Sequence, residues 1–89
     1  MKEVLVISAV WCPSCLILNK NLKKLKSEYP NLKIRKLDYD LDEEEVKEYN
    51  IGTILPVMDI KEDEKEKDRL IGEKKYEEII SFLKKGNII

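Results

Sequence analysis

Two cysteines separated by two residues follow a short apolar segment near the N-terminus of this 89-residue chain. The segment Val4–Ile7 is continuously apolar and rich in β-branched residues, which is typical of a strand buried on both faces in a parallel sheet. The motif Trp-Cys-Pro-Ser-Cys at residues 11–15 comes directly after it. A helix is predicted to begin within this motif. The motif therefore lies at the turn from a buried strand into a helix, and this location constrains the fold more than the cysteine spacing alone.

The segment after the motif has the apolar spacing of an amphipathic helix. Leu18, Leu22, Leu25 and Tyr29 recur at intervals of four, three and four residues, which places them on one helical stripe. Pro30 is expected to end this helix. A second strand is predicted over residues 32–37. Strand, helix and strand within so few residues form a βαβ unit, whose crossover should be right-handed.

The second half of the chain predicts a short helix followed by a hairpin and a last helix. Asp42 and Glu45 have the spacing of a capping box, so a helix is predicted over residues 43–49. Strands are predicted over residues 57–60 and 69–71, joined by the charged stretch 61–67, which reads as a solvated loop.

The last predicted helix contains Tyr76, Ile79, Ile80 and Leu83, and Gly86 is expected at its C′ position. The element order is then β-α-β-α-β-β-α. This order predicts one α/β domain over residues 1–89, with a four-stranded mixed sheet and helices on both faces.

Composition excludes several classes of function. The chain has 17 Lys and Arg against 18 Asp and Glu, so it lacks the basic excess of a nucleic-acid-binding protein. It has no histidine, which removes the commonest general base and metal ligand. Zinc normally takes four protein ligands, and a single chain offers only two cysteines. We therefore expect no resident metal or cofactor.

The sequence predicts neither a membrane-spanning segment nor a signal peptide. No apolar stretch approaches the roughly 20 residues needed to span a bilayer, and Glu3 does not suit the basic region of a signal peptide. We expect a cytoplasmic protein with no membrane partner. A closely spaced cysteine pair in that compartment favours catalysis over a structural disulfide.

The position of Cys12 suits a nucleophile. Unpaired N–H groups and the helix dipole at a helix N-terminus stabilise an anion, and the thiolate is the reactive form of cysteine. Cys15 lies about one turn further along the same helical face and should be more buried. Cys12 can then attack a substrate disulfide, and Cys15 can resolve the mixed disulfide. Pro13 fits the first helical turn, where a missing N–H has no cost.

Two further features accompany the cysteines. Pro56 stands at the start of a predicted strand. X–Pro bonds are usually trans, and only the pairing with the cysteine motif favours a cis Leu55–Pro56 bond, which would expose the backbone of Leu55 to a substrate. Trp11 should flank Cys12, either as a partly buried core aromatic or as an apolar contact for incoming proteins.

With these features the chain resembles the thioredoxin family. The resemblance rests on the Trp-Cys-Pro-Ser-Cys motif after an apolar strand, on the proline loop Tyr49–Pro56, on Gly72 before the last helix and on residues 36–38 at the end of the second strand. It covers essentially the whole chain and implies a minimal thioredoxin fold.

The resemblance also implies a role for individual residues. Cys12 would be the attacking thiol and Cys15 the resolving thiol. Trp11 would line the substrate groove, Pro56 would be a cis-proline facing the active site, and Lys36 would be the lysine near the buried thiol, able to tune its pKa. The residues expected to contact substrate are Trp11, Pro13, Ser14, Leu55 and Pro56.

The chain also departs from the family pattern. It lacks the extra N-terminal strand and helix of typical thioredoxins, so its size is that of a glutaredoxin. Val6 occupies the place of the family's buried aspartate, which removes the usual proton acceptor for Cys15. The Gly-Gly-x-Asp glutathione-binding pattern of glutaredoxins is absent, with only Gly72-Glu73 at that place. We therefore expect a protein-disulfide reductase rather than a glutathione-dependent enzyme.

The resulting hypothesis is a thiol–disulfide oxidoreductase that acts in electron transport and cell redox homeostasis. Its expected partners are disulfide-containing protein substrates and an upstream thiol reductase, and we expect a monomer. Two alternatives stay open at this point. One is a dimeric metal or iron–sulfur carrier that uses the cysteine thiolates of two chains. The other is a non-catalytic binding module that kept the fold.

Overall fold

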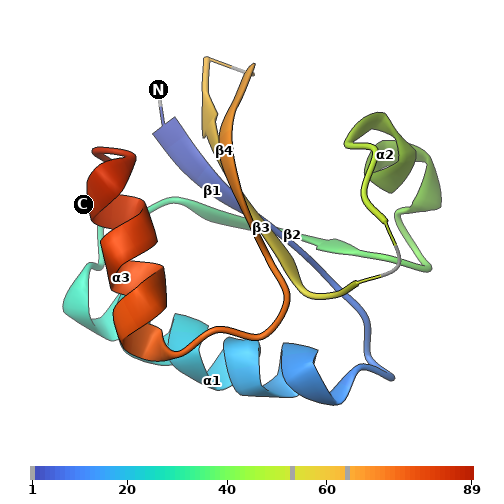
Figure 1. Ribbon diagram of the computed structural model, residues 1–89, viewed down its shortest axis with the longest axis horizontal. Coiled ribbons are helices and arrows are strands. Elements are labelled where there is room, and N and C mark those ends of the chain that lie inside the picture. The colour runs from blue at the N-terminus through green and yellow to red at the C-terminus, as the bar shows by residue number, and fades with distance from the viewer. Residues whose placement is uncertain (1, 53, 64) are drawn as a thin grey trace.

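Figure 1 shows the fold of the chain in a computed structural model that describes residues 2–52, 54–63 and 65–89. Thr53, part of the proline loop above, and Glu64, part of the charged stretch, lie outside the described residues. The elements follow in the predicted order: β1 (Lys2–Ser8), α1 (Pro13–Glu28), β2 (Ile34–Asp38), α2 (Glu43–Glu48), β3 (Val57–Glu62), β4 (Lys65–Ile71) and α3 (Tyr76–Lys85).

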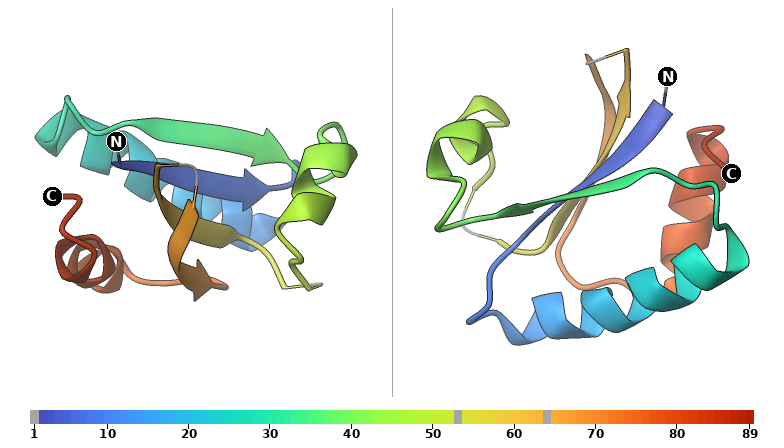
Figure 2. Two further views of the ribbon diagram at one scale, coloured as in Figure 1. Left: turned by 90° about the horizontal axis from the view of Figure 1, so that it is seen from above. Right: turned by 180° about the vertical axis from the view of Figure 1, so that it is seen from behind.

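The strands form one mixed sheet in the order β2-β1-β3-β4. β1 runs parallel to β2, with Val4 opposite Ile34, and antiparallel to β3. A parallel pair needs a long crossover connection, which α1 supplies. α1 and α3 lie on one side of the sheet and α2 lies on the other, near the C-terminal ends of β1 and β2 (Figures 1 and 2). The predicted four-stranded mixed sheet with helices on both faces is confirmed.

The sheet divides the core into two clusters. Val4 and Val6 pack with α1 and α3, and Leu5 and Ile7 face the other cluster, toward α2. All four side chains are fully buried, which explains why β1 reads as continuously apolar rather than alternating. The second cluster also contains both cysteines. No helix in the described part of the chain is long and apolar enough to cross a membrane.

The prediction that residues 61–67 form a solvated loop is wrong. β3 continues through Glu62 and β4 begins at Lys65, so most of this charged stretch belongs to the hairpin. Opposite charges face each other across the two strands, with Lys61 opposite Glu66 and Glu62 opposite Lys65. Such cross-strand pairs stabilise a ladder without an apolar face, so charge alone does not end a strand here.

The capping box predicted at the start of α2 is also absent. Asp42 is the N-cap residue, but its side chain makes no capping hydrogen bond to the helix and instead accepts the N–H of Asp38 at 2.8 Å. Glu45 pairs with Arg35 at 2.6 Å. Short acidic side chains bond readily to nearby turn backbone, and here the turn before α2 engages Asp42.

The C-terminal cap of α3 lies one residue later than predicted. Gly86 is the C-cap residue with φ −81°, and Asn87 takes the left-handed C′ position with φ 58°. The N–H of Ile88 then bonds to the carbonyl of Leu83 at 3.0 Å, as in a Schellman motif. Gly86 is small for a packing reason, because a Cβ atom there would collide with Cδ1 of Ile60.

Gly72→Ala is expected to lower the free energy of unfolding by about 1–2 kcal/mol. Gly72 has φ +86°, which disfavours any residue with a Cβ atom, and its N–H bonds to the carbonyl of Pro56 at 2.8 Å. Gly52→Ala is the matched control, since a Cβ atom there meets no atom within 4 Å. Urea denaturation measures both variants, and equal stabilities would contradict the prediction.

Candidate active site

Cys12 occupies the N-cap position of α1, where the sequence predicted it. Its N–H bonds to the carbonyl of Ala9 at 3.2 Å, and its own carbonyl accepts the N–H groups of Cys15 and Leu16 at 3.1 and 3.3 Å. Pro13 is the first residue of the helix. The thiol therefore sits at the N-terminal end of a 16-residue helix.

Cys15 lies one turn into α1 and is only 1% exposed. The pKa of its thiol is raised from 9.0 to about 11, mainly by burial and then by a hydrogen bond with the Cys12 side chain, while a backbone hydrogen bond at Ala9 opposes the shift. Both cysteines are free thiols. The pair is therefore asymmetric, with a protonated, buried second thiol beside the first.

The pKa of Cys15 predicts a strong pH dependence for its attack on a mixed disulfide. Only the thiolate attacks, so the rate of this step should rise roughly tenfold per pH unit at any pH well below the pKa. The aromatic disulfide dithiobis(nitrobenzoate) releases one coloured thiolate when Cys12 attacks and another when Cys15 resolves. Stopped-flow absorbance therefore separates the two steps. A resolving rate that is flat around neutral pH would show that another group takes the proton.

The same shift affects the stability of the reduced protein. The folded state holds the Cys15 proton more tightly than the unfolded chain, because the pKa is about 11 when folded and 9.0 in the absence of the fold. The contribution of Cys15 to the free energy of unfolding should therefore be fully present below pH 9.0 and be lost as the pH rises toward about 11. A Cys15→Ser variant lacks this titration and provides the control.

The structure brings Leu55 and Pro56 to the cysteines from 43 residues away. Sγ of Cys12 lies 3.9 Å from the carbonyl oxygen of Leu55, and the Leu55–Pro56 peptide bond is cis. Figure 1 shows the loop leading into β3 above the N-terminal half of α1. Ile54, just before this pair, is 61% exposed. The cis bond expected from the resemblance is confirmed, and the backbone of Leu55 lies beside the first thiol.

Trp11 lies on the surface beside Cys12. Its side chain is 60% exposed, which favours the contact role over the core role. Nε1 of Trp11 donates to Oδ2 of Asp40 at 2.7 Å, and the indole meets the ring of Tyr39 edge-on with centroids 6.3 Å apart. Asp40 and Tyr39 were missed by sequence reasoning, because nothing distinguishes them within an acidic loop until the fold places that loop next to Trp11.

Several exposed apolar side chains lie on the segments that carry Cys12 and Pro56 or on the strand paired with β3. Val10 and Ile71 join Trp11 and Ile54 in this set, at 81% and 47% exposure. Ser14 and Pro13, both expected to contact substrate, lie in the first turn of α1 and are at least partly exposed. Exposed apolar residues clustered at one place are typical of a surface that binds other proteins.

Lys36 lies on β2, at the strand position that the resemblance assigns to it. It is exposed on β2 opposite Val6, and borders a cavity of about 460 Å³ with Leu22, Lys23 and Lys26. Its effect on the buried thiol stays a prediction. Val6 is fully buried, so an apolar side chain fills the place where the family carries an aspartate.

The cysteines stand apart from other potential metal ligands. Among the described residues, no three or more side chains of His, Cys, Asp and Glu gather where they could hold a metal ion. The site geometry is that of a buried dithiol beside an exposed apolar surface.

Comparisons with known proteins identify the fold. The family model described as thioredoxin matches residues 1–85. A comparison with curated protein sequences finds no match. Among solved structures, mitochondrial thioredoxin 3 of Saccharomyces cerevisiae is 26% identical with a TM-score of 0.83, covering 94% of this chain and 77% of that protein.

Two other thioredoxins superimpose equally well. Fasciola hepatica thioredoxin is 26% identical with a TM-score of 0.85, covering 94% of this chain and 79% of its own. Thioredoxin f2, solved in a complex with ferredoxin:thioredoxin reductase, is 22% identical with a TM-score of 0.83, covering 97% and 77%, and shows the fold alone. Because the family match spans nearly the whole sequence and the fold agrees with it, the chain belongs to the thioredoxin family.

Proposed function

We propose that this protein reduces disulfide bonds in other proteins by dithiol exchange through Cys12 and Cys15. Membership of the thioredoxin family supports thiol–disulfide oxidoreductase chemistry in general. The observation that carries the finer proposal is the asymmetric pair, with Cys12 at the N-terminus of α1 beside the Leu55 carbonyl and Cys15 buried behind it.

The reaction takes two steps. The Cys12 thiolate attacks one sulfur of the substrate disulfide, whose S–S bond breaks, and the other substrate sulfur leaves as a thiolate. Cys15 then loses its proton and attacks Sγ of Cys12. This forms the Cys12–Cys15 disulfide and releases the second substrate thiol. The substrate gains two electrons and the protein loses two.

A second reaction must return these electrons. We propose an upstream thiol reductase as the donor, because the oxidised protein is itself a disulfide that a dithiol can reduce by the same exchange. Thioredoxin f2, which shares the fold, was solved in a complex with such a reductase. We also propose that the protein works as a monomer in the cytoplasm, where thiols are kept reduced.

The exposed apolar residues around Cys12 suit protein substrates. Trp11 precedes Cys12 and Ile54 precedes Leu55, whose carbonyl lies beside the Cys12 thiol, and both apolar side chains are exposed to an incoming protein. The metal-carrier and binding-module alternatives find no support in the comparisons.

The test is the reduction of insulin disulfides with dithiothreitol as the electron donor. The reduced wild-type protein should accelerate the reaction well above dithiothreitol alone. A rate equal to that of dithiothreitol alone would contradict general protein-disulfide reduction.

A further inference from the structure

A buried ion pair joins β3 and β4 on the α2 side of the sheet. Asp59 is fully buried, and its Oδ1 accepts the Nε–H of Arg69 at 2.9 Å. The two residues lie directly opposite each other in the hairpin. Burial raises the pKa of Asp59, and the hydrogen bond from Arg69 opposes that rise. An apolar pair at this place would avoid the desolvation of two charges, so the ion pair calls for a reason beyond stability.

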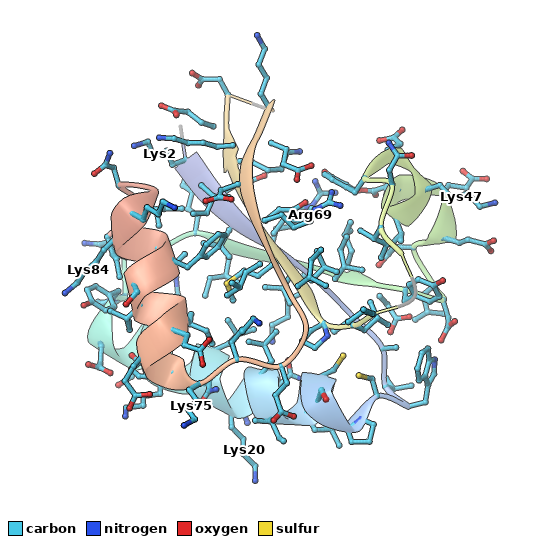
Figure 3. The ribbon with its side chains drawn as sticks, in the orientation of Figure 1. Lys2, Lys20, Lys47, Arg69, Lys75 and Lys84 are labelled. Carbon is cyan, nitrogen blue, oxygen red and sulfur yellow. The ribbon has the colours of Figure 1, made fainter. Side chains whose placement is uncertain are left out.

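The guanidinium of Arg69 also binds the end of α2. Nη2 donates to the carbonyl oxygen of Tyr49 at 2.5 Å and to Glu66 at 2.9 Å. Tyr49 is the C-cap residue of α2, where carbonyl groups lack partners within the helix. Figure 3 shows Arg69 between the hairpin and α2. The forked guanidinium thus connects a buried carboxylate to the C-cap residue of the helix, which a lysine could not do with the same geometry.

The side chain of Tyr49 also contacts the hairpin. Its hydroxyl accepts a hydrogen bond from Nζ of Lys61 at 2.8 Å, and the same ammonium lies 5.0 Å from the centre of the ring. Arg69 and Lys61 both come from the β3–β4 hairpin. The hairpin therefore fixes Tyr49 through both its main chain and its side chain.

Few side chains of α2 itself are buried, although Tyr49 and Ile51 after it also pack against the core. Val46 is the buried side chain of α2, and a cavity of about 400 Å³ borders Val46, Lys47, Asn50 and Ile51. A helix of six residues has little stability of its own. The contacts of Tyr49 with the hairpin are thus a main restraint on where the chain leaves α2.

The chain that leaves α2 leads to the active site. The substrate loop, defined here as residues 50–55 without Thr53, runs from Tyr49 to Pro56 and carries Ile54 and the Leu55 carbonyl beside Cys12. We propose that Asp59 and Arg69 are positioning residues, which fix Tyr49 and thereby set where the substrate loop presents Ile54 and Leu55 to a bound protein. This inference rests on the proposed function, because it assigns the loop to substrate binding.

The test compares two double variants. Asp59→Leu with Arg69→Met removes the buried pair and leaves no unpaired buried charge. Arg35→Met with Glu45→Gln is the matched control, because that exposed pair also links α2 to the sheet, at 2.6 Å, and does not involve Tyr49. Insulin reduction gives KM and kcat, and the reaction with dithiobis(nitrobenzoate) reports the cysteines without protein binding.

The first double variant is expected to raise KM for insulin about tenfold, since a small displacement of a binding group has effects of this order. Its kcat and its rate with dithiobis(nitrobenzoate) should stay within about twofold of wild type, because α1 still holds both cysteines. The control should match wild type in all three. Arg69→Lys keeps a cation beside Asp59 and should raise KM too, because a point donor cannot hold both the carboxylate and the Tyr49 carbonyl.

Backbone amide relaxation in solution provides a readout that needs no activity. The order parameters of Ile51, Gly52 and Ile54 should fall in the first double variant and stay at wild-type values in the control. A folded variant with wild-type KM and wild-type order parameters would overturn the inference, as would an equal rise of KM in the control. If wild type fails to reduce insulin, the proposed function fails, and the relaxation measurement still decides whether the pair fixes the loop.

Discussion

Cys12→Ser is expected to abolish the reduction of insulin. The serine hydroxyl keeps the shape of the side chain but is far less nucleophilic than a thiolate. The other thiol of the chain, Cys15, is 1% exposed against 6% for Cys12 and lies one turn further into α1, so it cannot replace Cys12. The rate above the dithiothreitol background should fall by roughly 10³-fold or more, as in other enzymes that lose their nucleophile. Turbidity of the reduced insulin chains measures this rate.

Cys15→Ser is expected to fail at a different step. Cys12 still attacks the substrate, but no buried thiol resolves the mixed disulfide. The covalent complex should therefore accumulate and appear by mass spectrometry as protein plus insulin, cleavable by dithiothreitol. The double variant Cys12→Ser with Cys15→Ser is the control and should trap nothing. Trapping by Cys12→Ser instead of Cys15→Ser would reverse the two roles.

Arg69→Met alone is expected to destabilise the protein by about 3–5 kcal/mol, because it leaves the Asp59 carboxylate buried without its partner. Asp59 has no exposed surface, and Arg69 is only 20% exposed at its side chain, so water cannot replace the lost interaction. This loss is a large share of the roughly 5–15 kcal/mol that stabilises a typical domain. The midpoint and slope of urea denaturation measure it.

Two comparisons show whether the loss comes from the unpaired charge. Asp59→Leu together with Arg69→Met should recover most of the stability, because replacing a whole buried pair with apolar residues is often neutral or favourable. Arg35→Met removes an exposed pairing partner of Glu45 and should change stability by less than about 1 kcal/mol. If the double variant is as unstable as Arg69→Met, the loss comes from packing and not from the charge.

The fold could be predicted from local patterns wherever a pattern had one structural meaning. The continuous apolar run of β1 and the helical stripe of α1 gave the right elements because burial on both faces, or on one stripe, leaves few alternatives. The charged hairpin was misread because a strand pair exposed on its faces does not need apolar residues. Cross-strand charge pairs hold it instead, and these depend on a register that the sequence did not reveal.

The ion pair between Asp59 and Arg69 was also missed. The hairpin register sets the two residues opposite each other. A seven-residue loop over residues 61–67 permits the same pairing, but it leaves the register of the two strands open, so nothing in the sequence singled out these two residues. The link from Arg69 to Tyr49 could not be predicted either way, since it joins the hairpin to a helix across tertiary space.

Part of the candidate site could be predicted from the sequence, and part could not. Cys12, Cys15 and their order of burial follow from position in a helix, which the sequence specifies. The partners of Trp11 depend on where the loop after β2 lies, so Asp40 and Tyr39 emerge only from the structure. The role of Lys36 stays a prediction, because its place on β2 opposite Val6 follows from the strand register while the reach of its long side chain does not.

Trp11 is the chain's only tryptophan, and it stands next to the attacking thiol. The hydrogen bond to Asp40 fixes the orientation of the indole, so tryptophan fluorescence comes from one side chain in one environment. No second indole contributes background. The protein thus contains a built-in fluorescent probe of its own redox centre, and the oxidation state of Cys12 can be followed in real time without a label.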